Sequence, residues 1–183
     1  LAMAVESWDD AGKRQIGEKG ELVCTKPFPS MPIGFLNDST GERYRSAYFD
    51  RFENTWCHGD FLEINQRGGV VIHGRSDTTL NPGGIRIGTA EIYRQVEVVD
   101  EVNEALVIGQ KYREDVRIVL FVTLLEGEKL DDQLKQKIRT QIRQNTTPHH
   151  NPKVIIAVPE IPRTLSGKIV ELAVKAVVEG KEI

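Results

Sequence analysis

A chain of 183 residues with 39% hydrophobic and 28% charged side chains is long enough for one domain or two small ones, which argues against disorder throughout. The net charge of −3 argues against nucleic acid or an anionic membrane bound through bulk charge, but allows a local basic pocket for a small anion. No apolar stretch approaches the roughly 20 residues of a membrane span, and the N-terminus lacks a signal-peptide pattern, so we expect a cytoplasmic protein.

Short strands separated by turns are predicted for residues 1–76. β-prone runs at residues 21–25, 61–64 and 70–74 alternate with Gly and Pro residues. The two cysteines, Cys24 and Cys57, have no metal-ligand spacing, so we expect reduced structural thiols. This part is therefore expected to be mostly β, and the chain enters it at once, as a piece of a longer polypeptide would.

A boundary near Asp77 separates this part from a second pattern. Pro before Gly in residues 80–85 suits a type II turn in a hairpin. Thr89 is a candidate cap for a helix with Ile92, Val96 and Val99 on one face, and strands are predicted at residues 105–108 and 118–122.

Two further helices are predicted. Asp131 and Asp132 precede an apolar repeat at Leu134, Ile138 and Ile142, which predicts the first of them. After a strand at residues 154–158, a last helix is expected to start near Ile169, to be ended by Gly180 and to bury the apolar stripe Ile169, Leu172, Ala173, Ala176 and Val177. We therefore predict a β-rich part at residues 1–76 and an α+β unit at residues 77–183 with a core of its own.

Lys168 is the first candidate for chemistry. It follows Ser166-Gly167 on a short polar loop before the expected helix, where backbone N–H groups and the helix dipole favour an anion. A solvated loop lysine would have the same pattern, so the residue alone leaves both interpretations open.

Asp60, Arg75 and Asp77 lie near the predicted boundary. We expect Asp60 on a turn after Gly59, where a carboxylate could accept two hydrogen bonds from a vicinal diol such as a ribose, although Gly-Asp is also a common turn pair. Arg75 offers planar donors to a ribose or phosphate, or is simply solvated at a strand end. Asp77 lies where a hinge would lie, or is an ordinary turn residue.

Two glycines and an arginine follow. Gly83 and Gly84 allow close approach of the backbone to a ligand, and a hairpin turn explains them equally well. Arg86 is a second possible phosphate contact. The histidines have no Glu or Cys at metal spacing, and no Gly-x-Ser-x-Gly elbow is present, so we expect neither a metal site nor a serine nucleophile.

Taken in order, three segments resemble the late motifs of the adenylate-forming acyl-CoA synthetases, and the resemblance covers most of the chain. They are Trp56-Cys57-His58-Gly59-Asp60, residues 74–92 and Pro162-Arg163-Thr164-Leu165-Ser166-Gly167-Lys168. Members of the family that use acetate or propionate more often have Thr-Gly-Asp where this chain has His58-Gly59-Asp60. That departure favours acetoacetate as the carboxylate substrate, with acetate or propionate as the alternatives.

The resemblance implies an α+β fold: a mobile C-terminal domain with a hairpin and a small sheet with helices, preceded by the β-rich tail of a large N-terminal AMP-binding domain. It implies a two-step ligation in which ATP and a carboxylate give an acyl-adenylate, and coenzyme A then displaces AMP. Lys168 would bridge the carboxylate and the α-phosphate, Asp60 would hold the ribose hydroxyls, and Arg75 would support the ribose.

By the same resemblance, Asp77 would be the hinge between the two steps and Gly84 would line the pantetheine channel. Arg86 would lie near phosphate, and Arg143 would contact the nucleotide phosphates of coenzyme A.

No segment resembles the family's phosphate loop, adenine site or Mg²⁺ site, which belong to the missing N-terminal domain, the expected partner. We therefore expect no ligase activity from the chain alone. A free-standing nucleotide- or carrier-binding module and a purely structural domain remain as alternatives.

Overall fold

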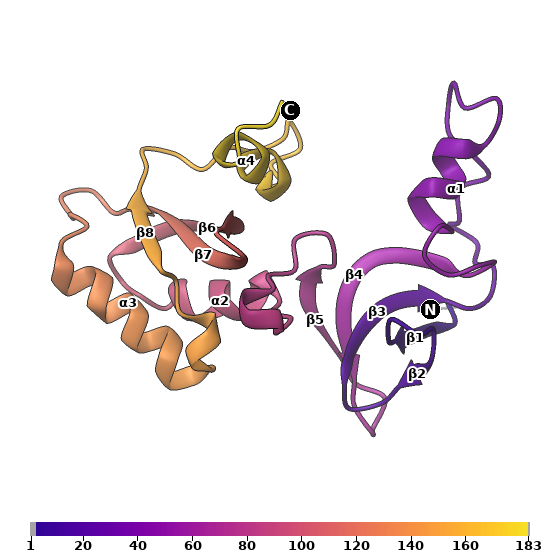
Figure 1. Cartoon of the computed structure of the whole chain (residues 1–183), viewed down its shortest axis with the longest axis horizontal. Coiled ribbons are helices and arrows are strands. Elements are labelled where there is room, and N and C mark those ends of the chain that lie inside the picture. Colours follow the sequence, from indigo (N-terminus) through magenta and orange to yellow (C-terminus); the bar gives the residue numbers. More distant parts are fainter. Residues whose placement is uncertain (1–2, 183) are drawn as a thin grey trace. The chain divides into compact units, whose positions relative to one another are not determined.

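The computed structural model describes residues 3–182 and divides between Ser76 and Asp77 into two compact units (Figure 1). Each unit has a sheet and a core of its own, so each is described by itself. The assignment of residues 1–76 to a large N-terminal domain and of residues 77–183 to a mobile C-terminal domain stays a prediction.

The first unit is an antiparallel sheet in the order β2-β1-β3-β4-β5. Its elements are β1 (Val5–Trp8), β2 (Arg14–Gln15), β3 (Lys19–Cys24), α1 (Glu42–Tyr48), β4 (Trp56–Ile64) and β5 (Val70–Arg75). The strands predicted at residues 21–25, 61–64 and 70–74 correspond to β3, β4 and β5. Aromatic packing closes one end of the sheet, where Tyr48 stacks on Trp56 at 3.7 Å between ring centroids.

The expected turn at Gly59-Asp60 is wrong, because β4 begins at Trp56 and both residues lie inside it. Gly59 has a φ of 82°, which favours glycine and bends the strand without ending it. Antiparallel pairing continues at Asp60, which lies opposite Arg75. A glycine that signals a turn in the sequence is therefore a kink within a long strand.

The second unit is built on a three-stranded sheet in the order β6-β7-β8. β6 and β7 form an antiparallel hairpin, and β8 pairs parallel to β7. In chain order its elements are η1 (Pro82–Gly84), α2 (Thr89–Val96), β6 (Val102–Tyr112), β7 (Asp115–Leu124), α3 (Asp132–Asn145), η2 (Pro148–His150), β8 (Val154–Ala157) and α4 (Glu171–Val178).

Alternation along β6 divides the core of this unit into two layers. Ala105 and Val107 pack with the buried faces of α2 and α3, whereas Leu106 and Ile108 pack on the opposite side with residues of α4. α3 and α4 accordingly lie on opposite sides of the sheet (Figure 1). The predicted apolar faces of α2 and α3 are confirmed by the burial of Ile92, Val96, Leu134, Ile138 and Ile142. Val99 is buried too, but it lies beyond the end of α2 at Val96, and the N-cap of α2 is Gly88 rather than the predicted Thr89.

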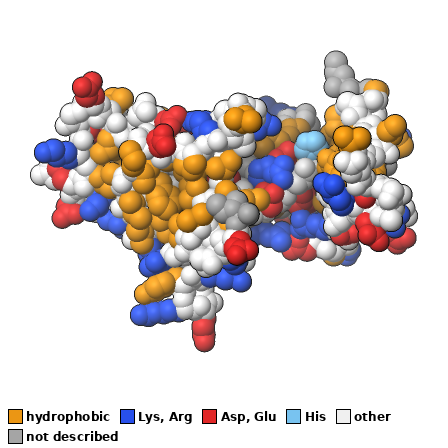
Figure 2. All heavy atoms as spheres, turned by 90° about the horizontal axis from the view of Figure 1, so that it is seen from above, with side chains coloured by type: hydrophobic (Ala, Val, Ile, Leu, Met, Phe, Trp, Pro, Cys, Tyr) orange, Lys and Arg blue, Asp and Glu red, His pale blue; other side chains and the backbone are white. Residues whose placement is uncertain are grey.

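The last helix differs from its prediction in two respects. α4 begins at Glu171, because Ile169 is taken up by a β-bridge to Arg163. The expected stripe is also wrong in part, since Leu172 and Val177 are 48% and 58% exposed and Val174 and Val178 pack on the sheet instead. Hydrophobic side chains consequently gather on the surface of this unit (Figure 2). Within residues 3–182 no helix has the length and apolar character of a membrane span.

Asp131 caps α3, and its loss is expected to weaken the second unit. Its carboxylate accepts a 2.8 Å hydrogen bond from the amide of Leu134. Asp131→Ala should lower the free energy of unfolding by about 1 kcal/mol. Chemical denaturation measures this, with Asp132→Ala as the control. The Asp132 side chain is fully exposed, so its removal should cost less than about 0.5 kcal/mol, and equal losses from the two variants would contradict the capping role.

Cys57 is expected to be inert in the folded chain. Burial, reinforced by the nearby Glu21, raises the pKa of the Cys57 thiol to about 12. Iodoacetamide at pH 8 should therefore modify Cys57 only after unfolding in guanidinium, because the thiolate is the reactive form. The folded pKa exceeds the unfolded value of about 8.5, so this thiol's contribution to stability is complete below that pH and is lost as the pH rises towards 12. Fast labelling of the folded protein would contradict this account.

Candidate functional site

Lys168 lies on a tight β-hairpin rather than at a helix N-terminus. The Thr164 amide donates to the Lys168 carbonyl at 2.8 Å, and the Lys168 amide donates to Thr164 Oγ1 at 3.1 Å. Gly167 between them has a φ of 82°, which allows the turn. Both the carbonyl and the amide of Lys168 are therefore hydrogen-bonded to Thr164, while the Lys168 side chain is exposed.

Arg163 holds this hairpin from its first strand. Its guanidinium donates to the carbonyl of Gly167 at 2.7 Å and to the carboxylate of Glu104 on β6 at 2.6 Å. The two contacts join the turn, next to Lys168, to a strand of the sheet 59 positions earlier in the sequence. Charge-assisted bonds of this kind are shorter and stronger than neutral ones.

Tyr93 holds the other end of the segment. Its hydroxyl donates to the carboxylate of Glu171, the first residue of α4, and accepts a 3.0 Å hydrogen bond from the amide of Val107 on β6. Burial, reinforced by the negative charge of Glu171, raises the pKa of the Tyr93 hydroxyl. The hydroxyl therefore stays protonated and remains a donor at physiological pH.

In the first unit the structure brings Asp60 and Arg75 together. They are directly opposite each other on β4 and β5, and the Arg75 guanidinium lies 3.3 Å from the position of a Cβ built on Gly59. His58 Nε2 lies 3.5 Å from Asp60 Oδ2, while His58 Nδ1 accepts from the indole of Trp56 at 3.3 Å. The indole contact assigns the imidazole proton to Nε2, facing the carboxylate. A partly exposed carboxylate and an exposed guanidinium thus lie side by side.

The remaining candidates lie on separate elements of the second unit. Asp77 is exposed, two positions after the end of β5 at Arg75. Gly84, with a φ of 79°, and the exposed Arg86 share a loop that is closed by a bridge between Leu80 and Ile87. The predicted hairpin is thus present, but its turn is not the expected type II. The Ile85 amide donates to the Pro82 carbonyl across Gly83 and Gly84, which are both left-handed, whereas a type II turn has only its second central residue in that region.

Asp115 fixes the glycine loop to the sheet. Its carboxylate accepts from the amide of Gly83 at 2.8 Å, and this bond with a second one from Val116 lowers the pKa of Asp115. A cavity of about 560 Å³ adjoins the loop, with Arg117, His149 and Lys153 among its lining residues. The loop therefore borders a hollow whose lining includes two basic side chains, Arg117 and Lys153, and the carboxylate of Asp115.

Arg143 is exposed in the last turn of α3. It lines a second hollow of about 560 Å³ together with Gln136, Arg139, Thr140, Gln144 and Asn151. Arg139 is partly held by the Pro152 carbonyl at 3.3 Å, and Arg143 lies one helical turn further along. Two guanidinium groups on one helix face are suited to an anion.

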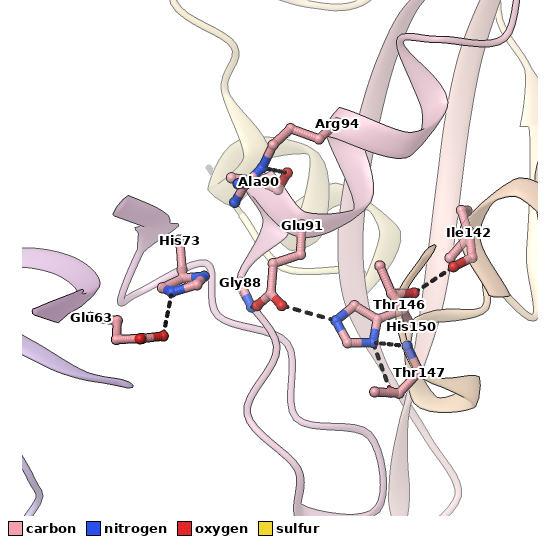
Figure 3. A network of polar contacts seen from close by, with 10 residues as sticks. All are labelled: Glu63, His73, Gly88, Ala90, Glu91, Arg94, Ile142, Thr146, Thr147 and His150. Atoms are coloured by element: carbon pink, nitrogen blue, oxygen red, sulfur yellow. Dashed lines mark hydrogen bonds and ion pairs between the residues drawn. The ribbon is translucent and has the colours of Figure 1, made fainter. Parts of the chain in front are cut away.

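A partly buried network that the sequence did not suggest joins the start of α2 to η2 (Figure 3). Glu91 accepts from the Gly88 amide at 3.0 Å, and its other oxygen lies 3.3 Å from His150 Nε2. His150 Nδ1 lies 2.9 Å from Thr147 Oγ1. Glu91 and His150 are 59 positions apart, so no local pattern reveals the pair, which has the character of a structural contact. Among residues 3–182 no three His, Cys, Asp or Glu side chains gather as a metal site would require.

Residues 95–168 match the family of AMP-binding enzyme C-terminal domains. All 183 residues align with acetoacetyl-coenzyme A synthetase of Rhizobium meliloti (strain 1021) at 62% identity and cover 28% of its length. The acetoacetyl-CoA synthetase of Gallus gallus is 45% identical over the whole chain, again across 28% of its own length. The chain thus corresponds to the C-terminal portion of acetoacetyl-CoA synthetases and spans just over a quarter of these relatives.

A solved structure agrees with this alignment. The acetoacetyl-CoA synthetase from Streptomyces lividans matches with a TM-score of 0.92 and 47% identity, over 98% of this chain and 27% of that one. The α+β fold expected from the sequence is confirmed by this likeness.

Gly59→Ala tests the kink beside Asp60 and Arg75. The new Cβ would meet the Arg75 guanidinium at 3.3 Å, and the φ of +82° is strained for alanine. The free energy of unfolding should fall by about 1 kcal/mol or more. Gly34→Ala is the control, because nothing lies within 4 Å of that position and its φ lies outside the left-handed range. If both variants unfold at the wild-type denaturant concentration, Gly59 is not required for the kink.

Proposed function

We propose that this chain is the C-terminal part of an ATP-dependent acid–thiol ligase that converts acetoacetate, ATP and coenzyme A into acetoacetyl-CoA, AMP and pyrophosphate. The observation that carries the proposal is 62% identity to an acetoacetyl-CoA synthetase over every residue of the chain. Relatives of this name in vertebrates and a nematode support the same substrate.

The reaction proceeds in two steps. A carboxylate oxygen of acetoacetate attacks the α-phosphorus of ATP, and the bond to the bridging oxygen breaks to release pyrophosphate. The thiolate of coenzyme A then attacks the acyl carbon of the adenylate and AMP leaves. ATP brings Mg²⁺, which we expect at side chains outside this chain and which neutralises the charge of the leaving pyrophosphate.

Lys168 serves the first step. Its ammonium lies between the attacking carboxylate and the α-phosphate, where it reduces the repulsion between two anions and stabilises the charge that develops as they join. The exposed side chain on an ordered hairpin supports this role, since an ammonium on a flexible stem reaches a ligand bound by a neighbouring domain.

Asp60 and Arg75 serve the nucleotide. The carboxylate of Asp60 accepts hydrogen bonds from the two ribose hydroxyls, and the guanidinium of Arg75 supports the ribose from the neighbouring strand. His58 presents its Nε2 proton to Asp60, which holds that carboxylate in place.

The other candidates serve the second step. Asp77 is the hinge about which the domain beginning there turns. Gly84 then lines the pantetheine channel, Arg86 lies near phosphate, and Arg143 contacts the nucleotide phosphates of coenzyme A. The exposure of Arg143 beside Arg139 supports an anion contact on α3.

The proposed partner of this C-terminal part is the large N-terminal domain of the same polypeptide. The proposed compartment is the cytoplasm.

Lys168→Ala tests the proposed role in the longer polypeptide. Acetoacetate-dependent pyrophosphate release should fall by about a hundredfold, because a few kcal/mol of electrostatic stabilisation is lost. Lys129→Ala, which removes another exposed loop lysine, should leave the rate unchanged. Acetate and propionate are compared as substrates, and wild-type preference for either over acetoacetate would contradict the proposed specificity.

The chain alone is expected to be inactive. Without the N-terminal domain Lys168 has no bound ATP to act on, so residues 1–183 should form no acetoacetyl-CoA from acetoacetate, ATP and coenzyme A. A thioester assay by mass spectrometry measures this, with the longer polypeptide as the positive control. Thioester formation by the chain alone would contradict the division of labour proposed above.

A further inference from the structure

The segment from Arg163 to Glu171 is attached to the sheet at both ends. Arg163 reaches Glu104 on β6, and Glu171 reaches Tyr93, whose hydroxyl also binds the amide of Val107 on β6. The two attachment points on β6 are only three positions apart. Lys168 lies between the two ends, on the exposed turn.

The attachments are well suited to hold a backbone in place. The Arg163 guanidinium joins two partners at once, the Glu104 carboxylate and the carbonyl of Gly167, which directly precedes Lys168. At 38% and 35% exposure, the Arg163 and Glu104 side chains are partly withdrawn from solvent. A planar guanidinium that bridges two acceptors fixes their relative orientation, which a single lysine contact would not do.

The core contributes little to this placement. The hairpin residues from Pro162 to Lys168 are exposed, and Leu165 is fully so. Apolar packing resumes only at Ile169, which lies against the α4 side of the sheet. The position of the turn relative to the sheet is therefore determined by the polar contacts of Arg163 and Glu171.

We propose that Arg163 and Glu104, with Tyr93 and Glu171 at the other end, are positioning residues that hold Lys168 for the adenylation step. The inference rests on the proposed function of Lys168. None of the four touches a reacting atom; they act through the backbone of the hairpin. A displacement of about 1 Å in a catalytic group costs on the order of a hundredfold in rate.

The decisive property of this proposal is its restriction to one step. Lys168 acts in adenylation, so loosening its hairpin should slow pyrophosphate release and spare thioester formation from an adenylate that is supplied ready-made. A role in folding alone would reduce both steps in proportion to the loss of native protein.

The test uses Glu104→Gln in the longer polypeptide, with both half-reactions measured. Glutamine keeps the shape of the side chain and an acceptor oxygen but removes the charge that faces Arg163. We expect pyrophosphate release to fall about tenfold, thioester formation from synthetic acetoacetyl-adenylate to stay within about twofold, and the unfolding temperature to change little. Glu101→Gln is the matched control, because Glu101 forms a 2.7 Å ion pair with Lys137 that has no connection to the hairpin.

A double-variant cycle tests whether Glu104 acts through Lys168. In a Lys168→Ala background, Glu104→Gln should cause no further loss of pyrophosphate release, since there is no ammonium left to position. Arg163→Lys and Tyr93→Phe should repeat the pattern of Glu104→Gln, as each weakens one attachment.

Three results would overturn the inference: equal losses in both half-reactions, an additive loss in the Lys168→Ala background, or an equal loss from Glu101→Gln. Failure of the proposed function is distinguishable from these, because there the wild-type polypeptide itself would release no pyrophosphate with acetoacetate, or Lys168→Ala would leave that release intact.

Discussion

The pairing of β6 with β7 is the constraint on which the second unit depends. Nine consecutive residue pairs in register, from Glu104 opposite Thr123 to Tyr112 opposite Asp115, form a hairpin whose two faces are both buried along its middle. Because side chains alternate, one face must receive α2 and α3 and the other α4. A slip by one residue would exchange these faces, so the register also fixes where Glu104 and Val107 meet the segment that carries Lys168.

In this arrangement one part of the second unit is rigid and another part extends towards a ligand. The sheet and its helices provide a fixed platform, and the lysine hairpin projects from it through a few polar contacts, with Lys168 at its exposed end. The first unit has the complementary character, since Asp60 and Arg75 are fixed by direct pairing of two strands. This division suits the proposed ligation, in which Lys168 delivers its ammonium to the nucleotide for the first step and is withdrawn for the second.

Much of the fold could be predicted from the sequence, because the strands and the faces of α2 and α3 follow from apolar periodicity at Ile92, Leu134 and their neighbours. The errors have physical causes. Gly59 indicated a turn but kinks a strand, and Ile169 indicated a helix but pairs with Arg163. The contacts of Arg163 with Glu104, Tyr93 with Glu171 and Glu91 with His150 join residues 59 to 78 positions apart, so no local pattern contains them. Asp60 and Lys168 were found through motif resemblance, and their roles stay predictions.

The central claim is that Lys168 meets the reacting groups during adenylation. A crystal structure of the longer polypeptide with acetoacetate and α,β-methylene ATP, which cannot release pyrophosphate, tests it most directly. The account predicts Lys168 Nζ within hydrogen-bond distance of both the acetoacetate carboxylate and the α-phosphate, on a hairpin still joined to Glu104 through Arg163. A complex with both ligands in place, the domains closed over them and Lys168 directed into solvent would contradict it.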